Sequence, residues 1–101
     1  MSADNQIIIP RSFVDLFVPA GRMRPTASHG HILARYELCE DLAQMLTETA
    51  RERLHELHVT ESDVLSRIRT GLEGGGVVES FEAAWVIRRL AELLGWPPLS
   101  E

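Results

Sequence analysis

Apolar residues recur along the middle of the chain at the spacing of one helical face. From Ser28 to Leu57 there is no proline, and steps of four and three residues separate most members of one apolar or small series, which only Arg53 interrupts: Ile32, Tyr36, Cys39, Ala43, Leu46, Ala50 and Leu57. Such a period is typical of an amphipathic helix. The pattern therefore predicts one long helix over about 29–57, with Ser28 as its N-cap.

The chain before this helix predicts a short helix followed by a loop. Pro10 has a fixed φ and no N–H donor, so it suits the first position of the short helix. The apolar residues of that helix share one face: Phe13, Leu16 and Phe17. Pro19 and Gly21 end it, and the loop extends to the N-cap of the long helix. Residues 1–6 are mostly polar, and we expect them to be frayed.

Two further helices are predicted after the long one. The first covers 61–72, with Thr60 as its N-cap. The glycines at 74–76 end it, because each glycine in a helix interior costs about 1 kcal/mol relative to alanine. The second covers 81–94, with Ser80 as its N-cap.

These elements predict an all-α fold, a small four-helix domain with one long central helix at about 29–57 and shorter helices packed on it. The length of 101 residues suits a single helical domain over 1–101. The chain has no run of about 20 apolar residues and no basic, then apolar, leader pattern. A single cysteine, Cys39, excludes an intrachain disulfide and fits a reducing compartment. We therefore expect a cytoplasmic protein without a membrane partner.

The choice of basic residues excludes several kinds of enzyme. All ten are arginine, so the chain lacks the lysine that a Walker A loop or a Schiff base requires. No recognisable catalytic signature surrounds the serines or Cys39. The histidine pairs, His29 with His31 and His55 with His58, are interpreted as surface residues because no cysteine completes a metal-ligand pattern. We predict a protein that is not an enzyme and has no cofactor and no metal.

Basic residues gather before the long helix, where an anion site is predicted. Backbone N–H groups at a helix start carry partial positive charge and favour anions. The expected anion-binding residues are Arg22, Arg24, Ser28, His29 and His31. The alternative is that these arginines only solvate a loop or pair with acidic side chains.

A second apolar set widens the stripe of the long helix beyond what three short helices are expected to cover. Uncovered apolar patches mark interfaces. The sequence therefore predicts a homodimer whose interface contains Leu38, Leu42, Met45 and Leu46.

Because no catalytic pattern is found, the helix surfaces are the features from which we predict a function. We expect a non-catalytic helical protein–protein interaction or adaptor module that engages an unidentified protein partner through an acidic helix face or through residues 13–17. The alternative is a DNA-binding transcriptional regulator that uses the helices at 61–72 and 81–94, with Arg88 and Arg89 as contacts. The net charge of −5 and the long turn between those helices oppose nucleic-acid binding.

Three segments resemble a known family: IPRSFVDLF at 9–17, RPTASHGHILARYELCEDLAQML at 24–46 and AAWVIRRLAELLGW at 83–96. They are similar to a family of short, uncharacterised proteobacterial proteins whose members are often named "ATPase with chaperone activity". The resemblance implies an association with chaperone machinery and a bacterial cytoplasm. The residues contradict an enzymatic meaning of that name, because a chain without lysine holds no Walker A motif.

Overall fold

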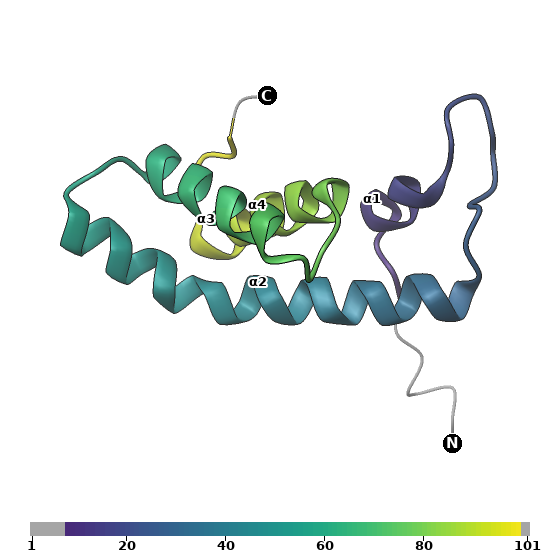
Figure 1. The fold of residues 1–101 in the computed structure, drawn as a ribbon, viewed down its shortest axis with the longest axis horizontal. Coiled ribbons are helices and arrows are strands. Elements are labelled where there is room, and N and C mark those ends of the chain that lie inside the picture. Colours follow the sequence, from purple (N-terminus) through teal and green to yellow (C-terminus); the bar gives the residue numbers. More distant parts are fainter. Residues whose placement is uncertain (1–7, 100–101) are drawn as a thin grey trace, which may run out of the picture. The chain divides into compact units, whose positions relative to one another are not determined.

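The computed structural model describes residues 8–99, and its regular elements are helical (Figure 1). They are α1 (Arg11–Val14), the 3₁₀ turn η2 (Asp15–Phe17), α2 (His29–Leu57), α3 (Glu61–Gly75) and α4 (Ser80–Leu94). No strand occurs within 8–99, which confirms the predicted all-α class. The bounds of α2 match the predicted long helix. The expected fraying of residues 1–6 lies outside the described residues.

The chain forms two compact units, Met1–Leu38 and Cys39–Glu101. We call them unit 1 and unit 2. The helix α2 contributes its first residues to unit 1 and the rest to unit 2. A single domain over 1–101 stays a prediction.

Unit 1 is organised around an aromatic cluster. The ring of Phe13 is fully buried. Its centroid lies 5.5 Å from that of Phe17 and 5.6 Å from that of Tyr36, which it meets edge-on. The N–H groups of Phe13 and Val14 donate to the carbonyl oxygen of Pro10, at 3.0 and 3.1 Å. Pro10 is therefore the N-cap of α1 and not its first residue, because its ψ of 143° lies outside the helical range.

The loop between η2 and α2 is closed by local hydrogen bonds. The N–H and hydroxyl groups of Thr26 both donate to the carbonyl oxygen of Phe17, at 2.9 and 3.3 Å. The Oγ of Ser28 accepts a hydrogen bond from the N–H of His31 at 3.1 Å. This bond confirms Ser28 as the N-cap of α2.

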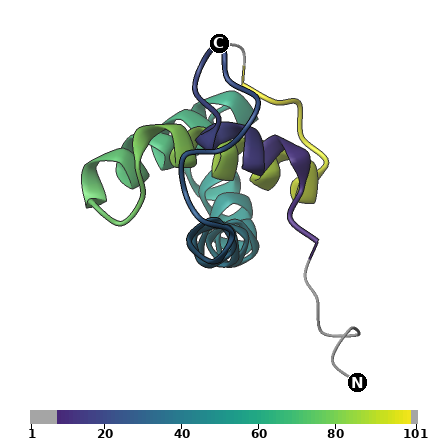
Figure 2. The ribbon, with the colours of Figure 1, turned by 90° about the vertical axis from the view of Figure 1, so that its right-hand side faces the viewer.

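In unit 2, α3 and α4 lie on the same side of α2 (Figures 1 and 2). One apolar cluster joins the three helices, with Ala50 from α2, three residues from α3 and three from α4. The members from α3 and α4 are Val64, Leu65, Ile68, Ile87, Leu90 and Ala91. The small residues of α2 in this unit, Cys39, Ala43 and Ala50, are fully buried. The prediction that shorter helices pack on the long one is confirmed.

The helix α3 begins as predicted but ends three residues later than the predicted Leu72. The Oγ1 of Thr60 accepts from the N–H of Asp63 at 3.1 Å, so Thr60 is the N-cap. The helix continues to Gly75 and stops at Gly76, whose φ of +76° is left-handed. The free-energy cost of glycine disfavours the helical conformation but does not by itself end a helix. Leu72, next to this last turn, packs against the core. The connection to α4 is consequently residues 76–79, shorter than predicted.

The start of α4 corrects a second prediction, because its N-cap is Glu79 and Ser80 is its first residue. Glu79 and Glu82 form a capping box: the backbone N–H of Glu79 donates to Oε1 of Glu82 at 2.8 Å, and the Glu79 side chain accepts from the backbone of Glu82. The hydroxyl of Ser80 instead donates to Oε2 of Glu73 at 3.2 Å. The hydroxyl of Ser80 is thus directed to α3, and Glu79, the residue before it, caps the start of α4.

Candidate functional site

A hollow of about 530 Å³ lies on unit 1 between the first helical segment and the following loop. It is lined by Arg11, Val14, Asp15, Val18, Arg22, Met23 and Pro25. We call it the arginine hollow.

The amphipathic character of residues 11–18 explains how the hollow is built. The positions 11, 14, 15 and 18 recur at helical spacing and form one face, which lines the hollow. Phe13 and Phe17 lie on the other face, in the aromatic cluster. Residues 13–17 were predicted to engage a partner, but the rings of Phe13 and Phe17 pack in the interior of unit 1. The face of residues 11–18 that lines the hollow is therefore the one that a partner could contact.

The charges in the arginine hollow are only partly paired. The Nε of Arg11 lies 3.4 Å from Oδ1 of Asp15, and both side chains are largely exposed, so this ion pair contributes little. The guanidinium of Arg22 pairs with no carboxylate in the described part of the chain. Met23 is 96% exposed beside it. The hollow therefore offers an unpaired cation next to an apolar surface.

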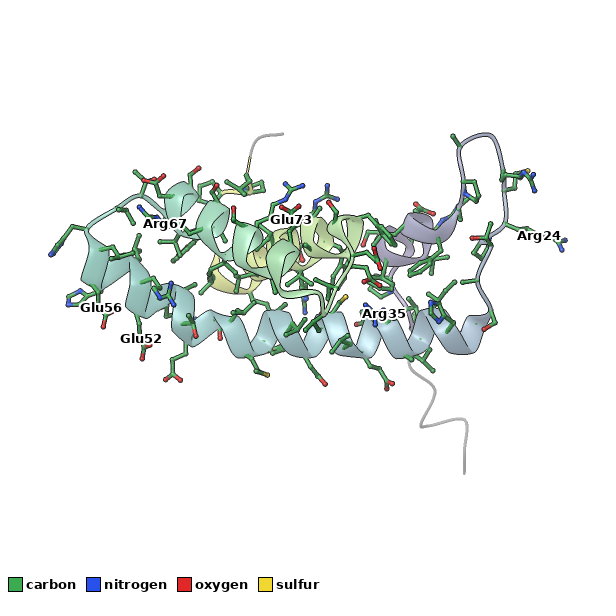
Figure 3. The ribbon with its side chains drawn as sticks, in the orientation of Figure 1. Arg24, Arg35, Glu52, Glu56, Arg67 and Glu73 are labelled. Carbon is green, nitrogen blue, oxygen red and sulfur yellow. The ribbon has the colours of Figure 1, made fainter. Side chains whose placement is uncertain are left out.

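The five residues of the predicted anion site have different surroundings. Arg22 lines the arginine hollow with Arg11. Arg24 does not line the hollow, and its exposed side chain points outward from the loop (Figure 3). The hydroxyl of Ser28 is the α2 cap. The ring of His31 meets that of Phe17 edge-on, at 6.0 Å between centroids, and His29 is exposed. Anion binding by these residues stays a prediction.

A second candidate surface lies on unit 2, on the side of α2 that faces away from α3 and α4. Its exposed residues are spaced by four, three and four positions: Asp41, Met45, Glu48 and Glu52. We call it the acidic row. Met45 is 70% exposed, and Glu52 points away from α3 and α4 (Figure 3). The three acids have no ion-pair partner among residues 8–99.

The predicted dimer interface is divided between the interior and this surface. Leu46 packs against the core of unit 2 and is therefore occupied within the chain. Leu38 and Leu42 are half-buried, and only Met45 of the four is exposed. The predicted stripe counted Leu46 as uncovered, because the sequence does not say which side of α2 the shorter helices cover.

An ion pair between α2 and α4 was not predicted from the sequence. The Nε of Arg89 lies 2.9 Å from Oε1 of Glu40, and its Nη2 lies 3.0 Å from Oε2. The bidentate guanidinium lowers the pKa of Glu40, and the carboxylate raises that of Arg89. Arg89 also contacts Glu92 at 3.2 Å. This arginine is therefore committed within the protein, and of the two expected DNA contacts Arg88 alone is exposed.

A smaller hollow of about 200 Å³ lies on unit 2 and is lined by Ala84, Ile87, Arg88, Pro98 and Leu99. No group of three or more His, Cys, Asp or Glu side chains among residues 8–99 is placed to hold a metal ion. None of the helices here is both long enough and apolar enough to span a membrane. The histidines of the second predicted pair, His55 and His58, are exposed.

The arginine hollow and the acidic row differ in their chemistry. One combines arginines with apolar side chains, and the other combines acids with a methionine. Comparison with known proteins found no match for this chain among family models, curated proteins or solved structures.

Proposed function

We propose that this chain is a non-catalytic protein-interaction module and that the arginine hollow binds an acidic, apolar segment of a partner protein. The observation that carries the proposal is the composition of the hollow, in which Arg11 and Arg22 accompany four apolar side chains and the single acid, Asp15, is paired with Arg11. Arginine presents two parallel N–H donors to a carboxylate, so the hollow suits glutamate or aspartate beside aliphatic residues.

The energetic balance favours a carboxylate near Arg22. Binding at Arg22 breaks no ion pair within the described chain. At Arg11 a ligand competes with Asp15, but that exposed pair is worth less than about 1 kcal/mol. Met23 supplies a flexible thioether, which adapts to different apolar partners. We expect weak, salt-sensitive binding that is specific for acidic and apolar character together.

The test uses a labelled synthetic helical peptide in which glutamate alternates with leucine and methionine at helical spacing. Fluorescence anisotropy measures its affinity for the full chain at low and high salt. Arg22→Ala is expected to weaken binding about five- to tenfold, since a partly exposed charged hydrogen bond contributes about 1 kcal/mol or slightly more. Arg24→Ala is the matched control on the same loop, outside the hollow, and is expected to change the affinity less than about twofold.

A peptide with glutamine in place of glutamate separates charge from apolar contact. The proposal predicts that this peptide binds at least about fivefold more weakly. Equal affinity for both peptides, or equal effects of the two arginine substitutions, would contradict it. The family resemblance directs the search for a natural partner to bacterial chaperone machinery.

One structural observation favours the DNA-binding alternative, and two oppose it. The connection of residues 76–79 has the length of a helix-turn-helix turn. However, α4 buries seven of its residues, and Arg89 is paired with Glu40. The alternative therefore depends on Arg88. Retention on duplex DNA at low salt that Arg88→Ala abolishes would favour it over the interaction module.

A further inference from the structure

This inference rests on the proposed function and names the partner. We propose that the arginine hollow of one copy of the chain binds the acidic row of a second copy. The two surfaces lie in different units, so each copy carries both halves of the contact. The assembly proposed is a symmetric dimer in which the contact occurs twice.

The chemistry of the two surfaces is complementary. In the acidic row, Met45 is flanked by Asp41 and Glu48, about 6 and 4.5 Å away along the helix axis at 1.5 Å per residue. In the hollow, arginines accompany valine, methionine and proline side chains, and the one carboxylate, that of Asp15, is paired with Arg11. Docking therefore places Met45 on the apolar residues and a carboxylate on Arg22. Both Arg22 and Glu48 lack ion-pair partners in the described part of their own chain.

The distribution of charge favours this pairing over the contact of like surfaces. Residues 1–38 hold four arginines and three acids, whereas residues 39–101 hold six arginines and twelve acids. Unit 1 is thus slightly positive and unit 2 strongly negative. Two acidic rows brought together would repel each other, whereas the arginines of the hollow attract the carboxylates of the row. Of the predicted dimer residues, Met45 belongs to this contact and Leu42 lies beside it, half-buried.

The test is charge reversal, read as molar mass by multi-angle light scattering at about 100 µM protein in low salt. The wild-type chain is expected near twice its monomer mass of 11.3 kDa. Arg22→Glu and Glu48→Arg are each expected to raise the dissociation constant at least tenfold, because each places two like charges together at both contacts. Circular dichroism confirms that each variant retains its helix content.

Mixing the two single variants supplies the decisive measurement. In an equimolar mixture, the hollow of the Arg22→Glu copy meets the row of the Glu48→Arg copy, and the unchanged hollow meets the unchanged row. Both contacts of the mixed dimer are therefore attractive, and the dimer mass is expected to return. The double variant Arg22→Glu, Glu48→Arg should also dimerise. The matched control is Arg24→Glu on the same loop, which should leave the mass unchanged.

Three results would overturn the inference. They are a wild-type monomer at this concentration, a dimer that neither reversal weakens, and two weakened variants whose mixture fails to recover. The proposed function is judged separately by the peptide experiment. A monomeric chain whose hollow still binds the acidic peptide refutes the second copy as the occupant and leaves the interaction module standing.

Discussion

The ion pair between Glu40 and Arg89 gives the sharpest stability prediction. The substitution Glu40→Gln keeps the size of the side chain and removes its charge. In the wild-type chain, the carboxylate accepts from Arg89 at 2.9 and 3.0 Å and from Nε2 of Gln44 at 2.8 Å. A glutamine retains one acceptor oxygen and brings an amide donor toward the guanidinium. We expect the variant to fold with a weaker connection between α2 and α4.

The magnitude follows from the geometry and the exposure of the pair. A charged hydrogen bond contributes about 1.5–3 kcal/mol when buried, and an exposed ion pair about 0.2–1 kcal/mol. The side chains of Arg89 and Glu40 are 33% and 19% exposed, so the pair lies between these limits. We expect Glu40→Gln to lower the free energy of unfolding by about 1.5 kcal/mol. For about 100 residues, this corresponds to a fall in Tm of about 7 °C.

The pH dependence provides an independent check. Because Arg89 lowers the pKa of Glu40 in the folded state, the stabilisation is present above the ordinary value of 4.5 and is lost as the pH falls through the lowered pKa. Urea unfolding followed by circular dichroism should therefore show a difference between wild type and Glu40→Gln at about pH 7 that shrinks as the pH falls below 4.5. A difference below about 0.3 kcal/mol at neutral pH, or one that persists unchanged into acid, would refute the reasoning.

Three further outcomes are expected. His58 follows α2 with a φ of +55°, a conformation that disfavours side chains, so His58→Gly should raise the free energy of unfolding by about 0.5–1 kcal/mol in urea titrations, whereas His58→Ala should give no gain. Glu79→Ala removes half of the capping box and should lower the free energy of unfolding by about 1 kcal/mol, and an unchanged urea midpoint would contradict this. Phosphate at tens of millimolar should shift the amide resonances of residues 30–33. The joint change Arg22→Ala with Arg24→Ala should abolish this shift. Uniform shifts along the chain would refute the anion site.

The features that could be predicted from the sequence are those that local spacing determines. The bounds of α2 follow from its apolar period, and the caps at Ser28 and Thr60 depend on residues three positions apart. The end of α3 was wrong because glycine near a helix end is tolerated when tertiary packing holds the turn. The cap at Glu79 was missed because serine is the commoner N-cap, although the acid three residues later was visible in the sequence.

The features that could not be predicted depend on distant residues. Arg89 and Glu40 are 49 positions apart, and nothing in the local pattern around either residue indicates the other. The arginine hollow combines α1 with the loop at Arg22, and its shape depends on how that loop turns. Arg22 was selected from the sequence as a cation near a helix start, but its association with Arg11 required the structure.

The burial of Cys39 makes the packing of α2 measurable without any label added by mutation. Its thiol is completely inaccessible to solvent in the folded chain, and it is the single cysteine of the sequence. An alkylating reagent reaches the sulfur only when the helices around it separate. The rate of modification, measured by mass spectrometry against an unfolded reference, therefore reports the free energy of that opening directly. Every variant discussed above carries this reporter at the same position.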